Sequence, residues 1–182
     1  MLQIRAFAFN ALQENTYVLF DETKDCVIID PGCYDEDEKS ELQEFVKSND
    51  LKVTRLLNTH CHVDHVLGNY FVKESYKVKL SIHRLEIPVL KAVAVYAPSY
   101  GFYQYEESEP DDFLAEGDRV SVGKHELTVI FVPGVSHPQI GLACFCCNTM
   151  WSPMMAGSLS SARRSGASAS PRTRKTRRCF IG

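Results

Sequence analysis

The segment Thr59-His60-Cys61-His62-Val63-Asp64-His65 follows an apolar, β-rich run that begins at Val53. Side chains two residues apart in an extended chain project to the same side, so the imidazoles of His60 and His62 should point together. Asp64 and His65 follow where the chain is expected to turn into a helix, and such a turn can bring them beside the first pair. Imidazole and carboxylate groups suit zinc or a similar divalent ion. The segment therefore predicts a metal site at the end of a strand.

The same spacing allows two metal ions rather than one. His60 and His62 would converge on the first ion, and Asp64 and His65 would hold the second, with a catalytic role assigned to Asp64. Two metals about 3.5–4 Å apart can polarise a substrate oxygen and lower the pKa of water to about 7, which supplies a nucleophile without a serine or cysteine. Asp30 ends the run Cys26 to Ile29, and from there we expect it to orient a ligating histidine by a hydrogen bond.

Other residues with metal-binding side chains carry weaker signals. Cys61 lies between the two histidines of an extended segment, so it should face the opposite side and serve a structural role. His83 and His125 lack clustered partners, and we expect a surface or core role for each. The protein has seven cysteines at irregular spacing, which argues against a disulfide framework. Cys144, Cys146 and Cys147 could suggest a metal cluster, but they sit in an apolar run and are predicted to be core residues of a strand.

Apolar periodicity and turn residues predict an α+β fold in which helices lie on a sheet. Predicted strands cover residues 4–9, 16–20, 26–29, 53–58, 78–82, 120–122, 126–132 and 140–147, and predicted helices cover 36–48, 66–76 and 85–95. Asp35 and Glu38 resemble a capping box at the start of the first helix. Pro88 lies in the first turn of the last helix, where a missing N–H is tolerated. Residues 96–112, rich in Tyr, Glu and Asp, are predicted to form a loop.

Length and composition predict one domain in residues 1–150 and an irregular tail in residues 151–182. The 182 residues carry a net charge of −3, yet the tail contains seven basic residues and no acidic one. A basic arm for nucleic acid is one interpretation of that asymmetry, and an out-of-frame translation product is the interpretation we favour. The first ten residues do not resemble a secretory signal, and no apolar run is long enough to span a membrane. We therefore expect a cytoplasmic protein, and nucleic-acid binding is disfavoured.

The H-x-H-x-D-H pattern of His60 to His65 resembles the signature of the metallo-β-lactamase superfamily. Further segments resemble glyoxalase II-type members in the same order: Glu14-Asn15-Thr16-Tyr17-Val18-Leu19, Ile28-Ile29-Asp30-Pro31-Gly32, Leu57-Asn58-Thr59-His60, Glu116-Gly117-Asp118 and Phe131-Val132-Pro133-Gly134. The resemblance implies an αββα sandwich with two metal ions, zinc in the first place and iron or manganese otherwise. It also implies hydrolysis of a small-molecule thioester or ester, such as S-lactoylglutathione.

The sequence departs from the family pattern after Gly134. The family places a metal-binding histidine where this chain has Val135, and His137 is displaced by two residues, so His137 is retained only as an alternative ligand. The family then places a bridging aspartate and a last histidine, whereas this sequence has no acid after Glu126 and no histidine after His137. We interpret this as a disrupted reading frame or truncation. The second half of the sandwich is therefore expected to be incomplete.

Four functional hypotheses follow. The first is a dinuclear zinc hydrolase of glyoxalase II type that acts on a thioester. The second is a mononuclear iron enzyme that acts on persulfides. The third is a remnant of such an enzyme that binds metal weakly or is catalytically impaired, and the fourth is a nucleic-acid binder that uses the basic tail. No oligomeric state is predicted.

Overall fold

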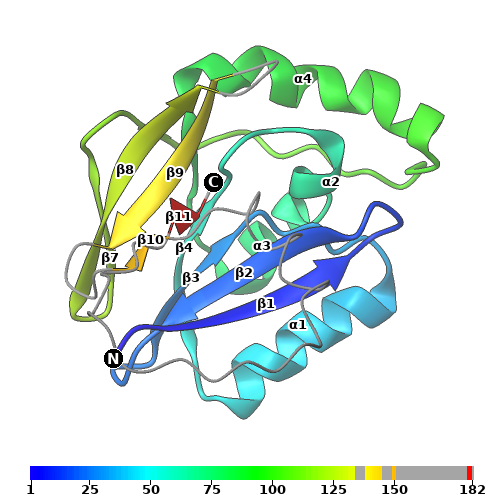
Figure 1. The fold of residues 1–182 in the computed structure, drawn as a ribbon. Helices are drawn as coiled ribbons and strands as arrows, with labels where there is room; N and C mark the ends of the chain where they lie inside the picture. Colours follow the sequence, from blue (N-terminus) through cyan, green and yellow to red (C-terminus); the bar gives the residue numbers. More distant parts are fainter. Residues whose placement is uncertain (134–137, 145–148, 151–179, 182) are drawn as a thin grey trace, which may run out of the picture.

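A six-stranded sheet carries the histidine segment at the end of one of its central strands (Figure 1). The computed structural model describes residues 1–133, 138–144, 149–150 and 180–181. The strands of this sheet, in spatial order, are β1 (Gln3–Phe9), β2 (Glu14–Phe20), β3 (Asp25–Ile29), β4 (Lys52–Leu57), β5 (Leu80–His83) and β6 (Asp112–Leu114). The first three strands pair antiparallel, and the pairs from β3 to β6 are parallel.

A second sheet packs against the inner face of the first. Its strands are β7 (Arg119–Val122), β8 (His125–Pro133), β9 (Pro138–Cys144) and β10 (Thr149–Met150), and β11 (Phe180–Ile181) pairs with β9. The β7–β8 hairpin turns at Gly123, whose φ of 56° lies in the left-handed region that glycine adopts without steric cost. The predicted hairpin is therefore confirmed, with its turn at the predicted glycine.

Helices cover the outer face of the first sheet. They are α1 (Glu36–Ser48), α2 (Val63–Val66), α3 (Asn69–Tyr76) and α4 (Ile87–Tyr96), with short 3-10 helices η1 (Arg84–Glu86) and η2 (Ala97–Tyr100) on either side of α4. Asp35 caps α1 as predicted, because its carboxylate accepts from the Glu38 N–H at 2.9 Å. The Glu38 carboxylate accepts from the N–H groups of Tyr34 and Asn10 instead of the Asp35 N–H, so only half of the capping box forms.

Strand alternation divides the apolar side chains between two cores. Tyr17 and Leu19 of β2 point between the two sheets, where they meet Val129 of β8 and Ile140 of β9. Val18 points the other way, toward the helices. Residues of the helix-side core include Ile28, Leu42, Val46, Leu56, Val72, Leu80, Leu90 and Val93. The apolar stretches Val27–Ile29 of β3 and Leu56–Leu57 of β4 are therefore buried on both faces of the sheet.

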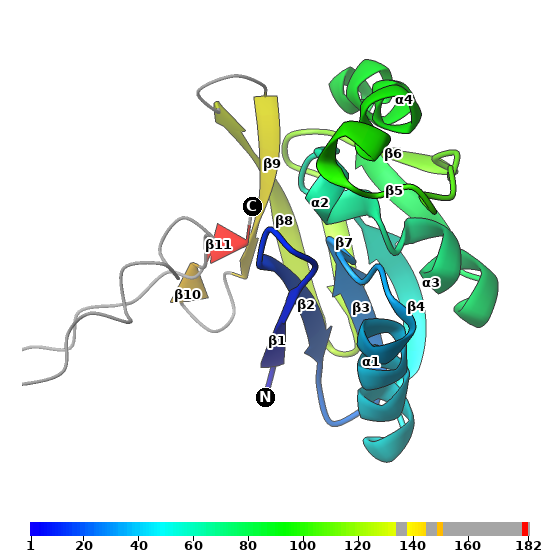
Figure 2. The same ribbon diagram turned by 90° about the vertical axis from the view of Figure 1, so that its right-hand side faces the viewer.

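The layers match the expected sandwich with an incomplete second half. Viewed from the side, α1, α3 and α4 lie on one side of the first sheet, and β7, β8 and β9 lie on the other (Figure 2). Within the described ranges, no helix covers the outer face of the second sheet. No helix in that part of the chain is long and apolar enough to cross a membrane.

Several elements differ from the sequence-based prediction, among them η2 in the predicted loop 96–112. The predicted helix 66–76 begins only with α3 at Asn69, because α2 ends at Val66 and the Gly68 N–H donates to Pro31 O at 2.7 Å instead of continuing that helix. β6 falls at the end of the predicted loop 96–112, and it is too short for an alternation signal. β11 lies in the predicted irregular tail and is only two residues long. Residues 145–148 of the predicted last strand, and 151–179 of the tail, lie outside the described residues.

Asp21 links the two sheets at the C-terminal end of β2, the end opposite the histidine segment. Its buried carboxylate accepts from Thr23 N at 2.8 Å and from the Lys124 N–H of the β7–β8 turn at 2.8 Å, and His125 Nε2 lies 3.7 Å away. Burial alone would raise the pKa of Asp21, but the hydrogen bond from the Thr23 hydroxyl, those from the Lys124 and Thr23 N–H groups and the His125 charge lower it to about 2. The ionised carboxylate thus stabilises the contact between the sheets.

We predict that Asp21→Asn lowers the free energy of unfolding by about 1–2 kcal/mol near neutral pH. Because the pKa of Asp21 is lowered in the folded state, its contribution is present above the unfolded pKa of about 4 and is lost as the pH falls through 2. Denaturant titrations between pH 7 and pH 2 should show the difference between wild type and variant shrinking in that window. Asp25→Asn is the matched control, and an equal loss in both variants, or a loss independent of pH, would contradict the prediction.

Candidate metal centre

The histidine segment begins where two parallel strands end side by side. Ile29 of β3 pairs with Leu57 of β4, and the Asp30 N–H donates to Leu57 O at 2.9 Å. Because β3 and β4 are parallel, the residues that follow each of them emerge at one edge of the sheet. The chain then runs through His60 into α2, so the predicted change from strand to helix lies within the motif.

The structure brings the four predicted side chains of the motif together. The ring of His60 lies 4.8 Å from that of His62 and 4.0 Å from that of His65, measured between centroids. Asp64 Oδ2 lies 3.5 Å from His65 Nε2. His60 is buried, whereas the other three side chains are partly exposed. The cluster is therefore closed on the protein side and open toward solvent on the other, as a site that admits a substrate requires.

Asp30 holds this cluster from below with a fully buried carboxylate. It accepts from Thr59 N at 2.7 Å and from Thr59 Oγ1 at 2.5 Å, and its Oδ2 lies 3.3 Å from His65 Nδ1. Thr59 Oγ1 in turn lies 3.1 Å from His60 Nδ1. The backbone of Asp30 has a φ of 50°, a left-handed conformation that Asp tolerates better than most residues. These contacts are compatible with the expected role of Asp30, because its carboxylate reaches His65 directly and His60 through the Thr59 hydroxyl.

The charges of Asp30 and His65 stabilise each other. Burial alone would raise the pKa of Asp30, but the charges of His65 and His60 and hydrogen bonds from His65 and Thr59 lower it. Burial alone would lower the pKa of His65, but hydrogen bonding and charge from Asp30, together with the Asp64 charge, raise it. The Asp30 carboxylate therefore favours a positive charge at His65.

Donor atoms of Asp30, His60 and His65 all lie within 4.8 Å of one another. This set combines two imidazoles with one carboxylate, and His62 and Asp64 add a further imidazole and carboxylate beside it. Such donors fit zinc, and also iron or manganese, without any thiolate. The residues present therefore fit the metal that the motif predicts, although ligation by each of them stays a prediction.

Glu14 belongs to the same cluster and was not predicted. Its buried side chain accepts from Thr16 Oγ1 at 3.0 Å, and its Oε1 lies 3.6 Å from His65 Nδ1. Burial raises the pKa of Glu14 well above its ordinary value, and the charges of Asp30 and Asp64 raise it further. A signal for it was present in the sequence. Glu14 and Thr16 alternate with Val18 on the same face of a strand, so two polar side chains share a face with a core residue.

Side-chain amides fix the turns around the cluster. Asn10 Nδ2 donates to Gly32 O and to Asp64 O, both at 3.0 Å, and Asn58 Nδ2 donates to His65 O at 2.9 Å. Gly32 leaves no room for a side chain, because a Cβ there would lie 2.7 Å from Asp64 O and closer still to the Glu14 carboxylate. The backbone carrying Asp64 and His65 is thereby held from both sides.

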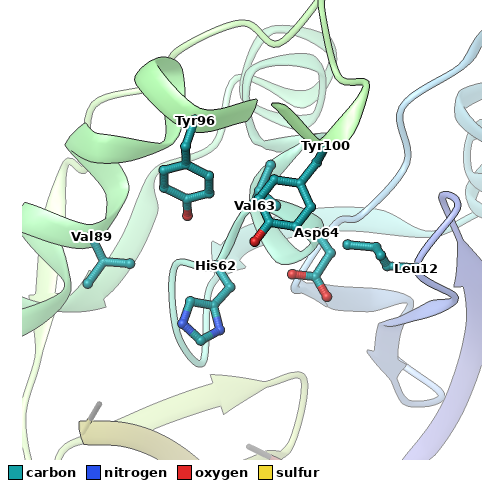
Figure 3. A pocket seen from close by; sticks show the side chains of 7 residues that line it. All are labelled: Leu12, His62, Val63, Asp64, Val89, Tyr96 and Tyr100. Carbon is teal, nitrogen blue, oxygen red and sulfur yellow. The ribbon is translucent and has the colours of Figure 1, made fainter. Parts of the chain in front are cut away.

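A cavity of about 460 Å³ opens beside the motif. Its lining residues are Leu12, His62, Val63, Asp64, Val89, Tyr96 and Tyr100. In Figure 3, His62 and Asp64 form one side of this cavity, and Tyr96 and Tyr100 lie across from them. The cavity therefore gives a small molecule direct access to two of the predicted metal ligands.

The other residues singled out in the sequence lie away from the cluster or outside the residues that the structure describes. Cys61 is fully buried in the helix-side core, and its N–H donates to Glu86 Oε2 at 2.7 Å. His83 accepts from the Leu85 N–H at the start of η1, and His125 lies near Asp21. Val135 and His137 lie outside the described residues, as do Cys146 and Cys147, so the predictions about them stay predictions.

Comparison with known proteins gives a family match over most of the chain. Residues 9–145 match the Metallo-beta-lactamase superfamily. A "Beta-lactamase hydrolase-like protein" of Agrobacterium fabrum is 31% identical over 166 residues, which cover 82% of this chain and 38% of that protein. A "Hydroxyacylglutathione hydrolase" of Francisella philomiragia is 28% identical over 163 residues, 84% of this chain and 54% of that protein. The chain thus spans about half the length of the curated relatives that it matches.

A solved structure with the same fold also has a related sequence. The crystal structure of TTHA1623 in a di-iron-bound form matches with a TM-score of 0.64 and 28% sequence identity, over 76% of this chain and 65% of that one. The two-sheet fold, the histidine motif at a strand end and the family match over residues 9–145 agree with one another. On these grounds the chain belongs to the metallo-β-lactamase superfamily.

Proposed function

We propose that this chain is a metal-dependent hydrolase that acts on a thioester or a similar ester, in the manner of hydroxyacylglutathione hydrolases. The observation that carries the proposal is the convergence of the His60, His62 and His65 rings beside Asp64, at the wall of a 460 Å³ cavity. A cavity of that size accommodates a small molecule rather than a polymer. The similarity to a hydroxyacylglutathione hydrolase over 84% of the chain supports the thioester as substrate class.

The residues divide into metal ligands and residues that position them. His60 and His62 would hold one ion, and Asp64 and His65 would hold a second. Zinc is the first candidate for these ions, and iron is the alternative because the similar structure of TTHA1623 is in a di-iron-bound form. Bound there, a divalent metal would supply a Lewis acid and lower the pKa of a water molecule. Asp30 would fix the ring orientation of His65 directly and that of His60 through the Thr59 hydroxyl, so that both rings keep their positions in the cluster.

A catalytically impaired relative is the second candidate. The sequence contains no acidic residue after Glu126 and no histidine after His137. A catalytic zinc site normally has three protein ligands and a water molecule, so His60 and His62 alone are one ligand short. Metal binding and turnover distinguish this candidate from the active hydrolase.

We predict that His60→Ala weakens zinc binding by more than about 100-fold, because replacing even the outer partners of a ligand typically costs 10- to 100-fold. Calorimetric zinc titration of the metal-free protein measures the affinity directly. His83→Ala is the matched control, since His83 is a histidine of the same sheet outside the motif. Equal affinities of His60→Ala and wild type would show that His60 is not a ligand.

We predict that Val135→His tightens one zinc site and leaves the other unchanged. The substitution would supply one more imidazole to the ion held by His60 and His62, and it does not replace a bridging carboxylate. The same titration should then resolve one improved site, with Ser136→His as a positional control. Two nanomolar sites in the unmodified chain would show instead that its ligand set is already complete.

We expect the zinc-loaded protein to hydrolyse S-lactoylglutathione or the neutral thioester S-phenyl thioacetate, slowly but above the rate of the metal-free protein. Thiol release measures the rate, and a chelator should abolish it. Parallel loading with iron, with metal content measured per chain, identifies the active metal. Zinc-loaded protein with no turnover would support the impaired relative, and sulfite release from glutathione persulfide by an iron-loaded sample would overturn the hydrolase assignment.

A further inference from the structure

Glu86 places a buried carboxyl group next to the histidine motif. It is the last residue of η1, immediately before α4, and its exposed fraction is 1%. Glutamate is rarely buried to this extent unless its carboxyl group has specific partners. One partner is the Cys61 N–H, which donates to Glu86 Oε2 at 2.7 Å. A buried acid at the start of α4 therefore holds the backbone of the motif.

Side chains rather than regular secondary structure fix the backbone at this point. Residues 58–62 lie between β4 and α2 and belong to neither a strand nor a helix. Two buried carboxyl groups hold the chain on either side of His60. Asp30 accepts from the N–H of the residue before His60, and Glu86 accepts from the N–H of the residue after it. The peptide that follows His60 is therefore fixed by Glu86.

This peptide controls how the two predicted ligands of the first ion point. Side chains two residues apart in an extended chain project to the same side, and the rings of His60 and His62 lie 4.8 Å apart between centroids. A rotation of the peptide between them would turn one ring away from the other. A buried N–H without an acceptor is costly, so loss of the Glu86 oxygen would favour such a rotation.

The same residue begins the segment that lines the cavity. α4 follows Glu86 directly, and its residues Val89 and Tyr96 line the cavity together with His62 (Figure 3). The contact from Glu86 to Cys61 therefore links the helix on one side of the cavity to the motif on the other. One hydrogen bond thus connects the ligand geometry with the position of the cavity wall.

We propose that Glu86 is a positioning residue of the metal centre, whose carboxyl oxygen holds the peptide between His60 and His62 so that both imidazoles face one ion. The inference deepens the proposed function and rests on the predicted ligation by these two histidines. It concerns the acceptor oxygen of Glu86 rather than its charge, and it assigns to Glu86 no contact with the metal or a substrate. Replacement of residues that orient a ligand typically costs about 10- to 100-fold in metal affinity.

Three substitutions separate the acceptor oxygen from the charge and from packing. Glu86→Gln keeps an acceptor oxygen and removes the charge, Glu86→Asp keeps the charge on a side chain one methylene shorter, and Glu86→Met keeps the length without an oxygen. We expect Glu86→Gln to bind zinc within about fivefold of wild type, because a neutral acceptor is weaker than an ionised one. Glu86→Asp and Glu86→Met should bind zinc about 10- to 100-fold more weakly. Calorimetric zinc titration of the metal-free protein measures each affinity.

The visible spectrum of cobalt(II)-loaded protein gives a second readout, because it reports the coordination geometry. It should change in Glu86→Asp and Glu86→Met and stay as in wild type in Glu86→Gln. Val46→Ala is the control for a general loss of stability, since Val46 is buried in the same helix-side core but belongs to α1. The folded state of that variant should bind zinc as tightly as wild type and give the same spectrum.

Wild-type zinc affinity of the folded Glu86→Met protein would overturn the proposal, and so would a loss in Glu86→Gln as large as that in Glu86→Met. If Glu86→Met does not fold, the comparison of Glu86→Asp with Glu86→Gln decides, and equal affinities of these two would contradict the role of the acceptor oxygen. The test needs no turnover, so zinc-loaded protein that does not hydrolyse a thioester would refute the proposed hydrolase function and leave this inference intact. Zinc binding that His60→Ala does not weaken would remove the ligand on which the inference depends and refute it.

Discussion

The buried carboxylate of Asp30 is the constraint on which the arrangement of the site depends. It accepts hydrogen bonds from the N–H and the hydroxyl of Thr59, and it lies 3.3 Å from His65 Nδ1. This one side chain therefore links the end of β3 to the start and to the end of the histidine motif. A buried charge of this kind is stable only with compensating partners. The partners here are the groups that would have to be fixed for metal binding, and stability and function therefore require the same contacts.

The position of this carboxylate follows from how the two sheets and the helices share the apolar side chains. The C-terminal halves of β3 and β4 are apolar and buried, with Ile28 and Leu56 in the helix-side core and Ile29 and Leu57 between the sheets. The first polar groups after each strand, Asp30 and Asn58, thus come together at the edge of the sheet, and they lie 3.4 Å apart between Asn58 Nδ2 and Asp30 Oδ1. The pattern that builds the core also places the site.

Local spacing was enough to predict the motif but not its surroundings. Strand parity and the change to a helix depend on neighbouring residues, so the grouping of His60 and His62 with Asp64 and His65 could be read from the chain. Glu14 of β2 joins the cluster through its contact with His65 of α2, and the break at Gly68 goes with the hydrogen bond from its N–H to Pro31 O. β6 exists because β5 pairs with it. Each of these features depends on residues distant in sequence. Strand alternation and helical periodicity use only neighbouring residues, so they do not predict such contacts.

The second sheet reaches the site through its backbone. The Ile140 N–H of β9 donates to Thr59 O at 3.1 Å, next to the hydroxyl that contacts both Asp30 and His60. All motif side chains come from the first sheet and the helix that follows it, so the described part of the second sheet supplies a frame rather than ligands. β8 ends at Pro133 and β9 begins at Pro138, and the segment between these strands contains the position where the family pattern places a histidine and this chain has Val135. Asp30, Thr59 and the Ile140 N–H thus fix the position of the motif from the described part of the chain.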